Sequence, residues 1–286
     1  GSTFFRKKCY ENQASPSAGS HQQTVDHGVT MPSQIGHFLA FFPLSILVWA
    51  GHMIVFHGLG LGFELCDRKG WLRRYKLRDR ERFAYTDFLP RVLVNQTLVL
   101  LPAMWLCERL GLAFTGPKDI DWAWAVAAIV LMTVGHDIVQ YAAHRFLLHN
   151  ARFRWLGHAL HHSTGASKSI TACYMSAPDF FLTIVCPYLV PLILIGGGTA
   201  DLGFQLLVAS LGAVGGLYEH SGYDFAVGIR QSAAAGRASL LRLLPPSLVS
   251  SHAHGEHHRR SRVSFSDGFG SPGLCDTIFR TRWDLR

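Results

Sequence analysis

The chain has 286 residues, of which 49% are hydrophobic and only 16% are charged, whereas about a quarter are charged in a typical soluble domain. This composition argues against an ordinary soluble enzyme and indicates an integral membrane protein. The net charge of +8 is carried mainly between apolar runs, as in loops that face anionic lipid, so nucleic acid is not expected as a partner.

The first 33 residues are polar and rich in Ser, Gln and Gly, which predicts a disordered N-terminal tail over 1–33. Five apolar stretches follow, each near the length that a helix needs to cross a bilayer. They cover residues 35–65, 92–112, 122–148, 180–195 and 202–217. The last two are short and are joined by three glycines, so they form a hairpin that either spans the bilayer or only enters it. Prolines 43, 102, 187 and 191 lie inside the stretches and are expected as tolerated kinks.

The loop charges predict an orientation. Residues 68–83 are strongly basic, whereas residues 115–121 carry a single lysine, so the positive-inside rule places residues 68–91 in the cytosol. With one crossing per stretch, residues 143–149 and Tyr218 then emerge on that same side. The predicted organisation is a membrane unit with a basic cytosolic loop over 34–120 and a catalytic domain over 121–286.

Histidines form the strongest motif. The pattern H-x-x-H-H occurs twice, as His158, His161 and His162 and as His254, His257 and His258. Spacings of three and four residues place side chains on one face of a helical turn, where imidazoles can clamp a metal. One triplet could be a solvated polar face, but the repetition favours ligation.

Three further histidines lie close to these triplets in the predicted topology. His144 and His149 stand at the end of the third apolar stretch, about 140° apart on an α-helix, so they reach one site only if the helix ends there or if they flank a broad cluster. His220 follows the last stretch. Asp224, four residues later, either ligates or orients an imidazole, and Asp137 and His252 are candidates for indirect support of the ligands.

The number of imidazoles predicts two metal ions. The three clusters supply eight, and His220 a ninth, whereas a structural zinc ion takes four. The six cysteines are scattered without a C-x-x-C pair, so the ligands are nitrogen or oxygen atoms. Imidazole suits zinc, copper, iron and nickel, so ligand type alone does not name the ion. The chain has neither Glu-x-x-His pairs nor H-E-x-x-H.

Over residues 83–282 the sequence resembles the fatty acid hydroxylase and sterol desaturase superfamily of membrane non-haem di-iron oxygenases. The resemblance rests on an Asp-containing helix that ends in H-R-x-x-x-H, on the two H-x-x-H-H motifs and on the histidine after the last membrane helix. T-A-C-Y-M-S from Thr171, E-H-S-G-Y-D-F from Glu219 and C-D-T-I-F-R-T from Cys275 are similar to segments of the cholesterol 25-hydroxylase and sterol methyl oxidase branches.

This resemblance implies an all-α, integral membrane helical bundle whose cytosolic helical cap holds a dinuclear site. Its implied metals are two iron ions, with zinc as a substitute, and its implied ligands are His144, His149, His158, His161, His162, His220, His254, His257 and His258. The implied reaction consumes O2 and electrons from an external donor, such as a b-type cytochrome with its NAD(P)H reductase, at the endoplasmic reticulum.

The favoured substrate is a membrane sterol, which the enzyme would hydroxylate or oxidise at a methyl group. Fatty acyl or sphingolipid hydroxylation and sterol desaturation stay open as alternatives. Outside this class of enzyme, the chain could be a metal transporter or a non-catalytic, metal-stabilised membrane protein. A transporter would carry its ionisable ligands near the bilayer midplane, whereas these histidines cluster at one membrane face.

Overall fold

Helices make up all the regular elements of the computed structural model, which describes residues 41–79, 82–228 and 250–285. Within these residues the predicted all-α class is confirmed; the one strand-like feature is an isolated antiparallel bridge between Lys76 and Tyr223. The predicted disordered tail, residues 1–33, lies outside the described residues. The division of the chain at residue 120 stays a prediction.

Five helices are long and apolar enough to cross a bilayer, as the sequence predicts for an integral membrane protein. Three of them are α-helices joined or extended by a π-helical turn, in which the hydrogen bond spans five residues. The five are α2 (Leu44–Lys69); α3 (Tyr85–Asn95) with α4 (Leu101–Arg109); α5 (Trp122–Ala142) with the turn Ala143–Leu148; α7 (Ala177–Phe180) with α8 (Cys186–Leu194); and α9 (Leu202–His220). The last two have 18 and 19 residues, so the hairpin is long enough to span.

The helix ends differ from the predicted boundaries. Pro43 has an extended backbone (φ −51°, ψ 140°) and precedes α2, so it starts that helix and does not kink it. The second helix begins at Tyr85, where the Asp87 carboxylate accepts a hydrogen bond from the Ala84 amide (2.7 Å). This helix therefore begins seven residues before the predicted apolar stretch, which starts at residue 92. The fifth helix runs on to His220, three residues past its predicted end.

Two of the predicted proline kinks coincide with π-helical turns. Pro102 follows the turn Gln96–Leu100, and Pro187 follows the turn Phe181–Val185. Proline lacks the N–H that would continue the α-helical ladder, and a π-helical turn is one of the ways in which a helix absorbs that loss. Each helix therefore continues past its proline.

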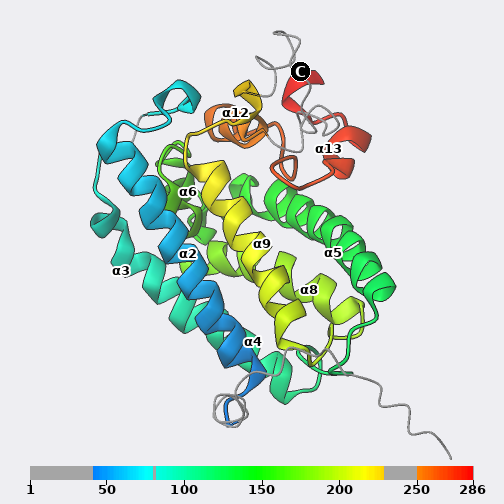
Figure 1. Ribbon diagram of the computed structural model, residues 1–286. Helices are drawn as coiled ribbons and strands as arrows, with labels where there is room; N and C mark the ends of the chain where they lie inside the picture. Colours follow the sequence, from blue (N-terminus) through cyan, green and yellow to red (C-terminus); the bar gives the residue numbers. More distant parts are fainter. Residues whose placement is uncertain (1–40, 80–81, 229–249, 286) are drawn as a thin grey trace, which may run out of the picture.

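The membrane helices pack as a bundle in which α2 contacts α9 and α4, while α5 contacts α8 (Figure 1). Apolar side chains such as Phe56, Val92, Phe180 and Leu217 are buried at their common core. The outer faces carry large exposed apolar side chains, among them Ile54, Leu98, Trp122 and Leu194. Such an apolar exterior suits hydrocarbon, which agrees with an integral membrane protein.

Three short helices form a cap over one end of the bundle: α6 (Ala159–His162), α12 (His252–Arg260) and α13 (Leu274–Ile278) (Figure 1). The basic segment that follows α2 lies at the same end, because Lys76 of this segment pairs with Tyr223, just after α9. The basic segment and the histidine motifs therefore share one end of the molecule, as the predicted topology requires.

Candidate metal centre

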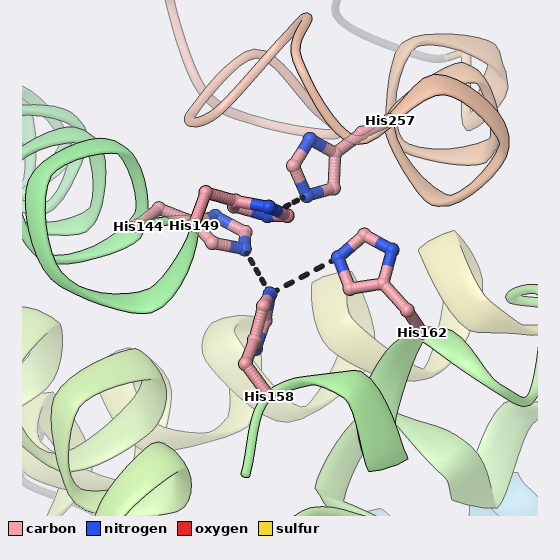
Figure 2. A group of neighbouring side chains, drawn as sticks. All are labelled: His144, His149, His158, His162 and His257. Atoms are coloured by element: carbon pink, nitrogen blue, oxygen red, sulfur yellow. Dashed lines mark hydrogen bonds between the residues drawn. The ribbon is translucent and has the colours of Figure 1, made fainter. Parts of the chain in front are cut away.

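The structure brings all nine predicted histidines together, in two adjacent groups. The first group comprises His144, His149, His158, His162 and His257, which converge from the end of α5, from α6 and from α12 (Figure 2). The second group comprises His161, His220, His254 and His258. Within each group the candidate ligand atoms lie within 4.8 Å of one another, close enough to surround one ion.

Each H-x-x-H-H triplet is divided between the two groups. His158 and His162 belong to the first group and His161 to the second, whereas His254 and His258 belong to the second and His257 to the first. On an α-helix, residues four apart differ by about 40° in direction, while adjacent residues differ by about 100°. The first and last histidines of a triplet therefore belong to one group and the middle one to the other.

The first triplet lies on a short helix. Gly157 adopts a left-handed conformation (φ 77°) that separates a 3-10 turn, Ala151–Leu156, from α6. The triplet still lies on one α-helical turn, because the His162 amide donates a hydrogen bond to the carbonyl oxygen of His158, four residues back (3.2 Å). In α12 the helix is continuous through Gly255.

A π-helical turn explains how His144 and His149 reach one group. The His149 amide donates to His144 O over 3.0 Å, five residues back. Such a turn holds more residues than an α-helical turn, so side chains five apart come to the same face. Their ring centroids are 5.2 Å apart.

Hydrogen bonds fix the proton positions of three first-group imidazoles. His144 Nδ1 donates to Phe265 O over 2.7 Å, and His257 Nδ1 donates to Val263 O over 2.7 Å. His158 Nδ1 donates to both carboxylate oxygens of Asp179 over 2.9 Å. With the proton on Nδ1, each neutral ring presents a lone pair on Nε2.

These lone pairs point at one another. His158 Nε2 lies 2.9 Å from His144 Nε2 and 3.0 Å from His162 Nε2, and His149 Nε2 lies 3.1 Å from His257 Nε2. When both rings are neutral, neither His144 Nε2 nor His158 Nε2 carries a proton to share, so the contact is repulsive unless a cation lies among the rings. The first group therefore fits a metal ion bound through Nε2 atoms.

The second group has the same character. His220 Nδ1 donates to Gly216 O over 2.9 Å, which leaves its Nε2 as a lone pair 3.1 Å from His161 Nε2 and 3.0 Å from His254 Nε2. His161 Nδ1 and both nitrogens of His258 are buried without a hydrogen-bond partner. Buried polar atoms are seldom left unpaired, and a metal ion would account for His258.

Six imidazoles outside the membrane helices are held neutral. Burial, followed by the neighbouring imidazoles, lowers the pKa of His149 and of His162 to about 3. The same causes lower the pKa of four others well below the usual 6.5: His161, His254, His257 and His258. A histidine must be deprotonated to ligate, so these six are ready to bind metal at neutral pH.

The three predicted supporting residues, Asp137, Asp224 and His252, make the following contacts. Asp137 accepts hydrogen bonds from Ser271 Oγ and from the Leu274 and Cys275 amides, so it anchors the start of α13. Asp224 accepts from the Ala226 amide and from Ser250 Oγ and belongs to neither histidine group. The His252 ring packs edge-on against Trp283. None of these contacts orients an imidazole.

Two acidic residues that the sequence analysis did not single out provide the support. Asp179 binds His158 directly, and no local sequence motif marks it. Asp276 accepts hydrogen bonds from the amides of Phe265, Ser266 and Asp267. These bonds fix the turn in which the carbonyl of Phe265 accepts a hydrogen bond from His144.

Arg78, in the basic segment, links the backbone around the second group. Its guanidinium donates to Ala166 O (2.9 Å), to Glu219 O (2.8 Å), and to Ser251 O and Oγ (both 3.2 Å). A Cβ atom on Gly255 would lie 2.3 Å from this guanidinium, so glycine in α12 makes room for it. The basic run was interpreted only as an orientation signal, although Arg78 also joins three ligand-bearing segments.

A cavity of about 360 Å³ connects the histidine groups with the interior of the bundle. His144, His161, His220 and His254 line it at the cap, and mainly apolar side chains of α2, α4, α5, α8 and α9 line the remainder. Along α5 the lining extends from Ile129 to His144, which corresponds to roughly 22 Å of helix. Its volume and apolar walls suit an elongated lipid.

Residues 129–281 match the family model described as "Fatty acid hydroxylase". A methylsterol monooxygenase of Aspergillus fumigatus is 27% identical, over 79% of this chain and 74% of that protein. Methylsterol monooxygenase 2-1 of Arabidopsis thaliana is 26% identical, over 86% of this chain and 91% of that protein. The C-4 methylsterol oxidase of Candida albicans is 25% identical, over 64% and 62% of the two chains. No solved structure matches.

Proposed function

The chain belongs to the fatty acid hydroxylase family, and on that premise we propose that it is a membrane-bound oxygenase that oxidises the C-4 methyl group of a sterol. The substrate class is supported by the relatives named methylsterol monooxygenase or C-4 methylsterol oxidase. The single observation that carries the proposal is the apolar cavity that ends on both histidine groups. Through this cavity a lipid can reach the end of the bundle at which the histidines of both groups converge.

The five histidines of the first group and the four of the second would hold one iron ion each. When bound, the two irons supply the activation of O2, which no side chain of this chain can perform. The chain contributes the ligands and keeps them oriented, through Asp179 on His158 and through the carbonyls of Phe265 and Val263 on His144 and His257. Zinc could occupy the same imidazoles without supporting oxidation.

The cavity contributes position and dryness. Its walls are mainly apolar, so a sterol inside it displaces water and presents one end to the histidine groups. Iron and electrons reach the groups from the side of the cap. The electrons come from an external donor, for which we favour a b-type cytochrome and its NAD(P)H reductase. The chain has no C-x-x-C-H haem motif, and its one G-x-G-x-x-G, from Gly268 to Gly273, does not follow a strand as a dinucleotide fingerprint would.

We propose that the cap faces the cytosol and that the protein lies in the endoplasmic reticulum membrane. The positive-inside pattern of the loops and the methylsterol monooxygenase relatives support this proposal. The basic segment and both histidine groups lie at one end of the bundle, in keeping with this orientation. A metal transporter is disfavoured because the histidines lie at the end of the bundle and the cavity beyond them has apolar walls, which would not pass an ion.

The test is oxidation of a 4-methylsterol by iron-loaded protein in lipid nanodiscs, with O2 and a reductase system. We expect about two irons per chain and a sterol product that gains one oxygen, read by mass spectrometry. His257→Ala should abolish activity and lower the iron content. His252→Ala is the matched control, because His252 lies in the same helix but outside both groups. An active His257→Ala protein, or an iron-loaded wild type that oxidises no sterol, would contradict the proposal.

A further inference from the structure

Six buried side-chain polar atoms in the described part of the chain have no hydrogen-bond partner. Three belong to His161 and His258, and a metal ion would engage one nitrogen of His258. One belongs to Gln205, which does not line the cavity. The other two, Gln140 Oε1 and Tyr188 Oη, belong to side chains that line the cavity. A buried polar atom without a hydrogen-bond partner lowers the stability of the protein, so a ligand that pairs with these two atoms would be bound favourably.

Three other polar side chains of the cavity wall are already engaged. Thr133 Oγ1 donates to Ile129 O over 2.8 Å, and Thr183 Oγ1 donates to Asp179 over 2.8 Å. Ser271 Oγ donates to Asp137 over 3.0 Å. Gln140 and Tyr188 differ from these three in offering buried polar atoms that the protein itself does not use.

Gln140 lies directly beside the first histidine group. It precedes His144 by one turn, and its Nε2 is 3.4 Å from His144 Nδ1, whose proton is directed at Phe265 O. The carboxamide is thus separated from the converging Nε2 atoms by the width of one imidazole ring. Whichever way the amide is turned, its other end has no protein partner.

Tyr188 lies at nearly the same depth on the facing helix. A Cβ on Gly135 would lie 2.8 Å from Pro191, so α5 and α8 meet closely at this level. The two helices run in opposite directions, since α5 ends at the histidines whereas α7 begins there with Asp179. Tyr188 lies three residues closer to the cap than Pro191, so it is level with residue 138 of α5. Gln140, two residues further along α5, is therefore only about 3 Å nearer to the histidines than Tyr188 is.

We propose that the Gln140 carboxamide and the Tyr188 hydroxyl bind a hydroxyl group of the lipid substrate, next to the carbon that is oxidised. This inference rests on the proposed function and specifies how the sterol is recognised. In a 4-methylsterol the reacting methyl group and the 3-hydroxyl group are on adjacent ring carbons. A sterol held with its 3-hydroxyl on these side chains has its C-4 methyl group beside the histidine groups.

The same geometry disfavours oxidation of a sterol side chain. That reaction would direct the side chain toward the histidines and the 3-hydroxyl toward the far end of the cavity. Gln140 and Tyr188 would then face hydrocarbon, with their polar atoms still unpaired. Sites built to pair a substrate hydroxyl discriminate strongly against substrates that leave it unpaired.

The experiment compares a 4,4-dimethylsterol with its 3-deoxy analogue, in wild type and in the variants Gln140→Leu and Tyr188→Phe. Wild type should prefer the 3-hydroxysterol by roughly tenfold or more in kcat/KM. In each variant the hydroxysterol should lose most of this advantage, while turnover of the 3-deoxy analogue stays the same. Thr133→Val, which removes a hydroxyl already bonded within its own helix, should keep the wild-type ratio.

Iron content separates recognition from a structural role. Both variants should retain about two irons per chain; loss of iron from Gln140→Leu would show that Gln140 supports His144 and would overturn its assignment. A wild-type preference that both variants retain in full would overturn the inference alone. A wild type that oxidises neither sterol would overturn the proposed function and this inference with it.

Discussion

Replacing Arg78 by methionine should loosen the second histidine group selectively. The guanidinium holds three backbone segments at once: Ala166 lies just after the first triplet, Glu219 precedes His220, and Ser251 begins the turn into α12. Methionine has a similar reach but no hydrogen-bond donor. The three segments would then lose their common anchor, and the ligands they carry would become less well positioned.

The size of the effect follows from the contacts. A hydrogen bond from a charged group contributes about 1.5–3 kcal/mol, and such contributions are not additive around one side chain. Loss of the four hydrogen bonds of Arg78 is therefore expected to lower the free energy of unfolding by about 3–5 kcal/mol. Net stabilities are about 5–15 kcal/mol, so the variant should fold while being markedly less stable.

Metal affinity is the informative assay. In Arg78→Met the metal affinity of the second group should fall by about 10- to 100-fold, as when ligand-orienting contacts are lost. One of the two binding steps in a metal titration should therefore weaken, while the other changes little. Arg68→Met is the matched control: Arg68 is 63% exposed at the end of α2 and pairs only with Glu64 in the described contacts, so its loss should cost at most about 1 kcal/mol. Unchanged affinities in Arg78→Met, or equal weakening of both steps, would refute the reasoning.

Three further outcomes are expected. Asp179→Ala should weaken metal binding by the first group about 10- to 100-fold in chelator competition, because His158 loses its hydrogen-bond partner; unchanged affinity would argue against that role. His162→Ala should weaken the first site and His161→Ala the second, so the same site weakening in both variants would contradict the divided triplets. Burial lowers the pKa of His149 and His162 to about 3, whereas the unfolded chain binds protons near pH 6.5. Metal-free protein should therefore lose stability as pH falls below about 6.5, seen as a lower Tm at pH 5.5 than at 7.5, and a constant Tm would be inconsistent with neutral buried imidazoles.

The membrane helices could be predicted from sequence because length and apolarity decide whether a segment can cross a bilayer. The third helix, Trp122–Leu148, has the predicted bounds. Ends were predicted less well where capping decides them. Asp87 starts a helix seven residues before the apolar stretch begins, and Pro43 starts another inside its stretch. Both effects are local hydrogen-bond chemistry that hydropathy does not register.

The histidines of the candidate site could be predicted because their spacing is unusual, but their partition and support could not. Which ring serves which ion depends on the direction of each side chain around α6 and α12. The supports are largely backbone carbonyls, those of Phe265, Val263 and Gly216. Any residue type supplies a carbonyl, so the sequence holds no signal for them.

The divided triplets make the two groups structurally interdependent. Both α6 and α12 contribute to both groups, whereas α5 supplies only the first group and α9 only the second. An ion in the first group would tie the two cap helices to α5, and an ion in the second would tie the same helices to α9. Because α5 and α9 both line the cavity, filling the two groups would fix its walls and close its end together. Metal loading should therefore order the substrate cavity as well as the cap.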